Sequence, residues 1–103
     1  MSTKTKTIVK PGVDTEELVV PPGLYNVIYL NDSVTTMEFV IESLKAIFRH
    51  SEETAQTLTV KIHEDGSSVV GTLPYEIAEQ KGVEVTVLAR NNGFPLNVKL
   101  EPA

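Results

Sequence analysis

Residues 25–40 read Y-N-V-I-Y-L-N-D-S-V-T-T-M-E-F-V, and this stretch contains the clearest change of pattern in the chain. Its first part is a run of β-branched and aromatic side chains, which is typical of a strand. The run stops at two small polar residues, Asn31 and Asp32. A helix is expected directly afterwards, because Thr35 and Glu38 have the spacing of a capping box. The stretch therefore predicts a strand, a short polar loop and a helix.

The loop would hold acceptors for a cation next to apolar side chains. Asn31 offers an amide group and Asp32 a carboxylate. Met37 and Val40 are the first apolar residues of the expected helix. This pairing suits a ligand with one positive end and one apolar side chain, such as the first residue of a polypeptide. The alternative is an ordinary turn followed by core packing.

The rest of the chain predicts three helices in all and two further strands. Ser51 is a good N-cap, Asp65-Gly66 is a helix end, and residues 96–100 alternate as in a half-buried strand. The expected fold is an α+β domain, in which a small three-stranded antiparallel sheet packs on three helices in the order β-α-α-β-α-β. The expected elements are strands at 27–30, 69–73 and 96–100 and helices at 36–50, 52–65 and 74–90.

Two regions are expected along the chain. Residues 1–23 end in Pro21-Pro22-Gly23 and predict a flexible N-terminal tail, whereas residues 24–103 form the globular domain. From Leu24 onward, six Lys and Arg residues stand against eleven Asp and Glu residues. This acidic balance argues against nucleic acid as a partner and favours a cationic ligand.

Several classes of protein are disfavoured by composition and motifs. The chain has no Cys, so thiol catalysis and thiolate metal sites are excluded. No apolar run has transmembrane length and no signal-peptide pattern is visible, so we expect no membrane and a cytoplasmic address, or an organelle stroma if a transit peptide was removed. No phosphate-binding loop occurs. Asp32 and His63, with Ser33, Ser67 or Ser68, have the residue types of a hydrolase triad, but no nucleophile-elbow motif surrounds them.

An ordered set of short motifs resembles the ClpS adaptors, which recognise N-terminal degradation signals and hand their bearers to a Clp AAA+ unfoldase. The resemblance runs from Pro21 to Ala103. The matching residues are Leu30-Asn31-Asp32, Thr35, Met37–Ile41, His63, Gly71, Glu76–Glu79, Lys81, Ala89-Arg90, Asn92-Gly93, Pro95-Leu96 and Leu100-Glu101.

This resemblance implies a role for particular residues. The α-amino group of the ligand would be held by Asn31, Asp32 and His63, in a loop supported by Ser33 and Thr35. The first side chain would enter an apolar pocket, and first residues branched at Cβ would be rejected by steric exclusion. The residues that the resemblance assigns to this pocket are Met37, Val40, Thr59, Ile62 and Leu96.

The resemblance also implies the partners. Substrates would begin with Leu, Phe, Tyr or Trp, and Glu76 and Lys81 would contact the N-terminal domain of a ClpA- or ClpC-type unfoldase. Neither a cofactor nor an enzymatic activity is implied.

Two positions depart from the family pattern. Ser33 stands where a second Asp is usual, so one negative charge near the ligand's ammonium would be lost. Thr59 stands where Met is common, so the pocket would be larger or more polar. These departures leave open a second reading, a divergent paralogue that docks on the unfoldase but reads another signal or inhibits normal delivery. An N-acetylated peptide separates the two readings, because a reader of α-amino groups must lose affinity for it.

Overall fold

The structure is a computed structural model that describes residues 23–103. Apart from Gly23, the predicted tail lies outside these residues. The described elements follow in the order β-α-α-β-α-β, as predicted. They are β1 (Leu24–Leu30), α1 (Met37–Ala46), α2 (Glu52–Asp65), β2 (Ser67–Pro74), α3 (Tyr75–Asn91) and β3 (Asn97–Pro102).

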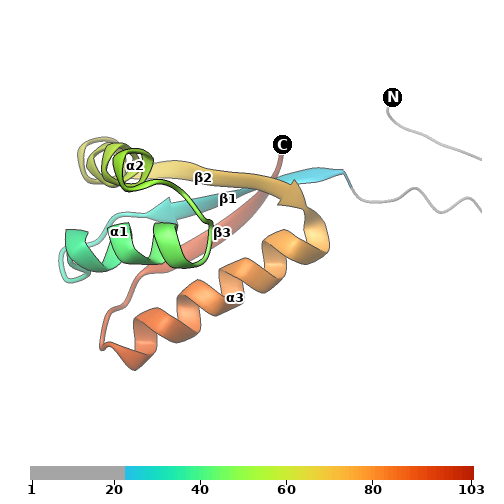
Figure 1. Ribbon diagram of the computed structural model, residues 1–103. Helices are drawn as coiled ribbons and strands as arrows, with labels where there is room; N and C mark the ends of the chain where they lie inside the picture. The colour runs from blue at the N-terminus through green and yellow to red at the C-terminus, as the bar shows by residue number, and fades with distance from the viewer. Residues whose placement is uncertain (1–22) are drawn as a thin grey trace, which may run out of the picture.

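The three strands form one antiparallel sheet in the order β2-β1-β3, so β1 is the central strand. Helix α3 packs against all three strands, and α2 packs against β2 and α1. Figure 1 shows α1 and α3 on the same side of the sheet, with α2 beside the start of β2. The last residue of β1, Leu30, pairs with Ser67 of β2 and with Asn97 of β3. The end of β1 therefore meets the starts of both edge strands.

A buried polar contact joins the central strand to α1. Tyr29 is fully buried, and its hydroxyl lies 2.8 Å from Oγ of Ser43. Ser43 Oγ donates to the Val40 carbonyl at 2.8 Å, so Tyr29 is the donor to Ser43. Burial raises the pKa of Tyr29 far above its ordinary value, by more than the hydrogen bond with Ser43 lowers it. The phenol therefore stays neutral and satisfied within the core.

Strand β2 contains an irregularity that brings it close to the end of α1. Val27 pairs with Gly71 but Ile28 pairs with Val69, so Val70 is an extra residue. The carbonyl of Val70 lies 2.6 Å from Nε2 of His50. A side chain at Gly71 would place its Cβ 3.1 Å from Cδ1 of Phe48. Glycine is therefore favoured here because an aromatic ring approaches the strand closely.

The predicted start of the first helix was wrong by one residue. The N-cap of α1 is Thr36, whose hydroxyl accepts a hydrogen bond from the backbone N–H of Phe39 at 3.2 Å. Thr35 belongs to the loop before this cap, where its hydroxyl donates to the carboxylate of Asp32. The predicted end, near His50, was also too late, since α1 ends at Ala46 and Arg49 has a φ of 62°.

The other helix boundaries agree better with the sequence. Ser51 caps α2 by accepting from the N–H of Thr54, and Gly66 ends α2 with a φ of 92°, both as predicted. Pro74 is the last residue of β2 and the N-cap of α3 rather than part of its first turn. Helix α3 continues without a break through Gly82.

Candidate functional site

The predicted binding residues come together at one end of the sheet. The backbone N–H of Asn31 donates to the carbonyl of Gly66 at 2.9 Å, which ties the loop after β1 to the end of α2. His63 lies on the last turn of α2, and Leu96 directly precedes β3, whose first residue pairs with Leu30. Met37 begins α1 directly after the loop, so three segments that are distant in sequence meet at this end of the sheet: the loop with the start of α1, the end of α2 and the start of β3.

Asp32 organises the loop through three hydrogen bonds. Its Oδ1 accepts from the backbone N–H of Val34 at 2.8 Å and of Thr35 at 2.7 Å. Its Oδ2 accepts from the hydroxyl of Thr35 at 2.7 Å. A carboxylate has about four acceptor positions, so roughly one remains for a ligand.

The charge of Asp32 is stabilised by its surroundings. Partial burial of the carboxylate opposes ionisation, but the hydrogen bonds from Thr35 and Val34 outweigh this effect and lower the pKa of Asp32. The positive charge of Arg90 acts in the same direction. Asp32 is therefore ionised at neutral pH and adds a negative charge to a loop in which Asn31 is exposed.

Arg90 is a residue to which the sequence analysis assigned no role. One of its guanidinium nitrogens, Nη1, donates to the carbonyls of Phe94 and Leu96, each at 2.9 Å. The other, Nη2, donates to Oδ1 of Asn97 at 3.3 Å. Arg90 thus holds the segment that presents Leu96. An Arg in the last turn of a helix, followed by a turn, is a sequence signal for such bonds.

The five predicted pocket residues divide into an exposed one and four buried ones. Met37 is 44% exposed, whereas Val40, Thr59, Ile62 and Leu96 are buried. Val40, Ile62 and Leu96 are members of one core cluster. The hydroxyl of Thr59 donates to the Ala55 carbonyl at 2.7 Å, so its hydrogen is used within α2. The O–H of Thr59 is therefore not directed toward a ligand.

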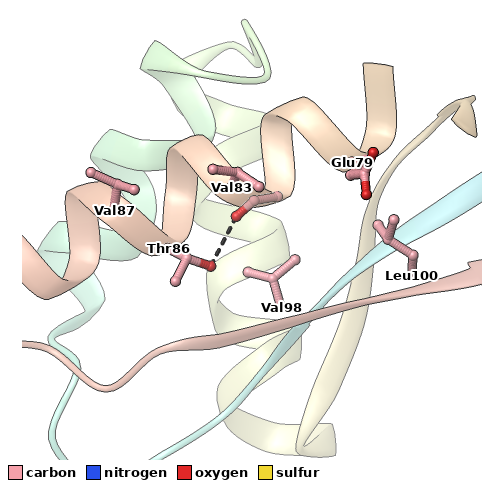
Figure 2. Close-up of a pocket in the computed structure, with 7 residues that line it drawn as sticks. Glu79, Val83, Thr86, Val87, Val98 and Leu100 are labelled. Carbon is pink, nitrogen blue, oxygen red and sulfur yellow. Dashed lines mark hydrogen bonds between the residues drawn. The ribbon is translucent and has the colours of Figure 1, made fainter. Parts of the chain in front are cut away.

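Three surface clefts of residues 23–103 lie elsewhere, and none of the three is lined by these five residues. The first lies between α3 and β3 (Figure 2). The second lies between α3 and Ile47, and the third lies beside the start of α1, where Phe39 packs on Phe94.

Glu76 and Lys81, the two residues expected to contact an unfoldase, differ in their surroundings. Glu76 is exposed in the first turn of α3. The ammonium of Lys81 donates to the carbonyl of Ile47 at 2.8 Å and lies 5.9 Å from the ring centroid of Phe48. Lys81 therefore secures the end of α1 to α3, a structural role that the sequence analysis did not predict.

Residues 23–103 contain neither a cluster of metal-binding side chains nor a helix suited to span a membrane. Residues 23–103 contain no cluster of three or more His, Cys, Asp or Glu side chains suited to a metal ion. None of the helices in these residues has the length and apolar character needed to cross a membrane.

The chain is similar to known proteins over most of its length. Residues 20–99 match the family described as "ATP-dependent Clp protease adaptor protein ClpS". The ClpS adapter of Nautilia profundicola is 44% identical over 97 residues, which are 94% of this chain and 96% of the relative. The ClpS adapter of Treponema denticola is 43% identical over 90 residues, which are 87% of this chain and 89% of the relative.

A solved structure has the same fold. Agrobacterium tumefaciens ClpS2 bound to L-phenylalaninamide is 45% identical and superimposes with a TM-score of 0.77, covering 80% of this chain and 99% of that chain. With the matching order of elements and the family match over residues 20–99, these likenesses confirm the resemblance deduced from the motifs. The chain belongs to the ClpS family of adaptors of the ATP-dependent Clp protease.

Proposed function

We propose that this chain binds polypeptides that have a free α-amino group and a bulky hydrophobic first residue, and delivers them to a Clp AAA+ unfoldase. The observation that carries the proposal is the ligand of the Agrobacterium relative, L-phenylalaninamide. Its ammonium and aromatic ring stand for the first residue of a substrate, and its amide stands for the first peptide bond. The adaptor acts by binding, without a catalytic step of its own.

In this proposal the α-amino group lies among Asn31, Asp32 and His63. Support comes from the hydrogen bond between Asn31 and Gly66, which brings the loop to the end of the helix that carries His63. Asn31 and His63 are both exposed, so their side chains are accessible to a ligand. The Asp32 carboxylate supplies the opposite charge, and the amide of Asn31 also binds the ligand backbone.

The first side chain enters beside Met37, the exposed member of the pocket set. The floor consists of Val40, Thr59, Ile62 and Leu96, which are buried behind it. Met has a flexible and polarizable side chain, so it adjusts to Leu or to an aromatic ring. Since Thr59 is smaller than Met and uses its hydroxyl hydrogen within α2, we expect room for the aromatic first residues Phe, Tyr and Trp.

The interactions available here amount to a moderate affinity. Burial of a Leu or Phe side chain contributes about 1.5–3 kcal/mol. Two or three charge-assisted hydrogen bonds add roughly 1.5–3 kcal/mol each, and the loss of translational and side-chain freedom removes several. The favourable terms sum to about 4.5–12 kcal/mol, so after a loss of at least about 4 kcal/mol the net value is at most about −8 kcal/mol, a Kd of about 1 µM or weaker. Such an affinity permits both capture and release of a substrate.

The test is fluorescence anisotropy with labelled peptides that differ only in the first residue: Leu, Phe, Tyr, Trp, Ile or Met, with N-acetyl-Leu as the control. Leu and the aromatic residues should bind, and acetylation should abolish binding. His63→Ala should weaken binding at least about threefold, the loss of one modest hydrogen bond, with an unchanged circular dichroism spectrum. Binding that survives acetylation, or that is absent for every free N-terminus, contradicts the proposal and favours the divergent docking role.

A further inference from the structure

A cleft with an aromatic wall and two carboxylates lies between the start of α1 and the end of α3. Its volume is about 400 Å³, and its lining includes Phe39, Leu88 and Phe94 together with Glu38 and Glu42. Figure 1 shows the start of α1 and the end of α3 at the same end of the molecule. We call this site the aromatic cleft. None of these five residues belongs to the proposed site for the first residue of a substrate.

The wall of the aromatic cleft consists of two phenylalanine rings in contact. The ring centroids of Phe39 and Phe94 are 5.1 Å apart, and the ring planes are inclined at 59°. Both side chains pack against the core but are only half-buried, so part of each remains accessible. Leu88 adds apolar surface at the end of α3. Accessible aromatic surface of this kind attracts cations as well as apolar groups.

The carboxylates of the aromatic cleft come from one side of α1. Glu38 and Glu42 are exposed and four residues apart, so their side chains are neighbours on the helix. None of the ion pairs within residues 23–103 involves Glu38. Lys45 lies 3.6 Å from an oxygen of Glu42, but its hydrogen bond goes to Glu52. A cation in the cleft would therefore gain from Glu38 in full and from Glu42 in part.

The aromatic cleft adjoins the proposed ligand site along two segments. Thr36 lines the cleft, and the next residue, Met37, belongs to the pocket set. Phe94 lines the cleft and is two residues before Leu96 of the same set. The α-amino group is proposed to lie toward His63 on α2, and the bonds from one Cα diverge. A substrate chain therefore leaves its first residue in a direction away from α2, toward the side where α3 ends.

We infer that the aromatic cleft is a second substrate subsite, which binds an Arg side chain at the third to fifth residue of the polypeptide. This inference rests on the proposed function, because it adds a contact to the same substrate. An extended chain advances about 3.3–3.6 Å per residue, so these residues are roughly 7–14 Å beyond the first. The guanidinium group is planar, stacks on aromatic rings and donates two parallel hydrogen bonds to a carboxylate. Lys has the charge without this planar shape.

Charge and composition argue against two other occupants of the aromatic cleft. From Leu24 onward the chain has eleven Asp and Glu against six Lys and Arg, so a second copy would bring like charges to Glu38 and Glu42. Residues 1–23 contain Lys4, Lys6 and Lys10 but no Arg. This segment of the chain therefore lacks the planar cation that the aromatic wall favours.

The test uses labelled Phe-initiated peptides that carry a single Arg at the third, fourth, fifth or tenth residue of an otherwise neutral sequence. Gln and Lys at the same positions are the controls, and affinity for the full-length chain is measured by anisotropy. At one or more of the three near positions, Arg should bind about three- to tenfold more tightly than Gln, as expected for one exposed ion pair and one cation–π contact. Lys should gain less, and Arg at the tenth residue should gain nothing.

The site is tested by the double variant Glu38→Gln, Glu42→Gln. It should lose most of the gain from Arg and bind the Gln peptide within about twofold of wild type, which verifies the fold and the first-residue site. The matched control is Glu53→Gln, Glu84→Gln, which changes the net charge equally at two exposed positions of α2 and α3 and should keep the gain. Phe94→Leu should reduce the advantage of Arg over Lys, because it removes one ring.

The outcomes separate this inference from the proposed function. If the Gln peptide binds but Arg gives no gain at any near position, the inference is overturned and first-residue recognition stands. An equal gain at the tenth residue, or equal losses in the two double variants, would show a general effect of charge and also overturn it. If a Lys4→Gln, Lys6→Gln, Lys10→Gln variant shows a gain that wild type lacks, the cleft belongs to the chain's own segment and the inference is wrong. If no free Phe-initiated peptide binds, both proposals fail.

Discussion

The substitution Asp32→Asn isolates the charge in the loop between β1 and α1. The amide retains a carbonyl oxygen that can accept from the backbone N–H groups of Val34 and Thr35. In the wild type the second oxygen accepts from the hydroxyl of Thr35. In the variant an NH₂ group replaces this oxygen, and the negative charge is lost. The loop is therefore largely preserved while the attraction for a ligand ammonium is reduced.

The expected loss of affinity follows from the kind of hydrogen bond that is changed. A hydrogen bond to a charged group contributes about 1.5–3 kcal/mol, whereas a neutral one contributes about 0.5–1.5 kcal/mol. The difference of about 1–1.5 kcal/mol predicts that Kd for a Phe-initiated peptide rises about five- to tenfold. Peptide affinity should also depend less on salt than in wild type, because one of the interacting charges is gone.

The assay is anisotropy of a labelled Phe-initiated peptide at low and high salt, with Thr35→Ala as the matched control. This control removes the hydroxyl bond to Asp32 and leaves the carboxylate charged. If charge is decisive, Thr35→Ala should weaken binding less than Asp32→Asn does. Wild-type affinity in Asp32→Asn would refute the role of the charge, and equal losses in both variants would show that loop shape is what matters.

The same carboxylate predicts the direction of a change in stability with pH. The pKa of Asp32 is lower in the folded chain than its ordinary value of 3.8. The carboxylate therefore stabilises the fold at pH values above 3.8, and this contribution is lost as the pH falls through the lower, folded-state pKa. Urea unfolding between pH 6 and pH 3 should show a smaller loss of stability in Asp32→Asn than in wild type.

Three further predictions concern stability and are measured by urea unfolding. Ser43→Ala should cost about 1–3 kcal/mol because it leaves the fully buried hydroxyl of Tyr29 without its partner, more than the roughly 1 kcal/mol expected for Tyr29→Phe; the reverse order would contradict the assigned donor. Gly71→Ala should cost about 1–3 kcal/mol through its contact with Phe48, and Phe48→Leu should relieve part of that cost. If no relief appears, backbone effects dominate at this position. Lys81→Met should cost about 1 kcal/mol because the end of α1 loses a hydrogen bond, and an unchanged stability would mean that Lys81 acts only at the surface.

Much of the fold was predictable because its signals are local. The cap at Ser51 and the left-handed Gly66 each depend on a few neighbouring residues, and both have the predicted role. The order of helices and strands followed from apolar periodicity for the same reason. The exposed valines of α3 lower helix propensity, yet the helix is continuous, because packing against the sheet outweighs propensity.

The start of the first helix was predicted wrongly because two neighbouring residues are suited to the same capping role. Thr35 and Thr36 both have a hydroxyl suited to an N-cap, and the sequence does not show which one binds elsewhere. The bend of the loop brings Asp32 to Thr35, which leaves Thr36 as the cap. The role of Lys81 was missed for a different reason, because its partner, the carbonyl of Ile47, is 34 residues away along the chain.

The sequence by itself determined the family, the order of the elements and the set of residues proposed to bind a ligand. These depend on residue types and on spacings along one chain, which can be read directly. The tertiary structure alone decided which of these residues face outward, which hydrogen bonds Asp32 already makes and how the ends of β1 and α2 meet at Asn31 and Gly66. It alone also showed that Val83 and Val87 of α3 are exposed, because exposure depends on contacts between segments that are distant in sequence.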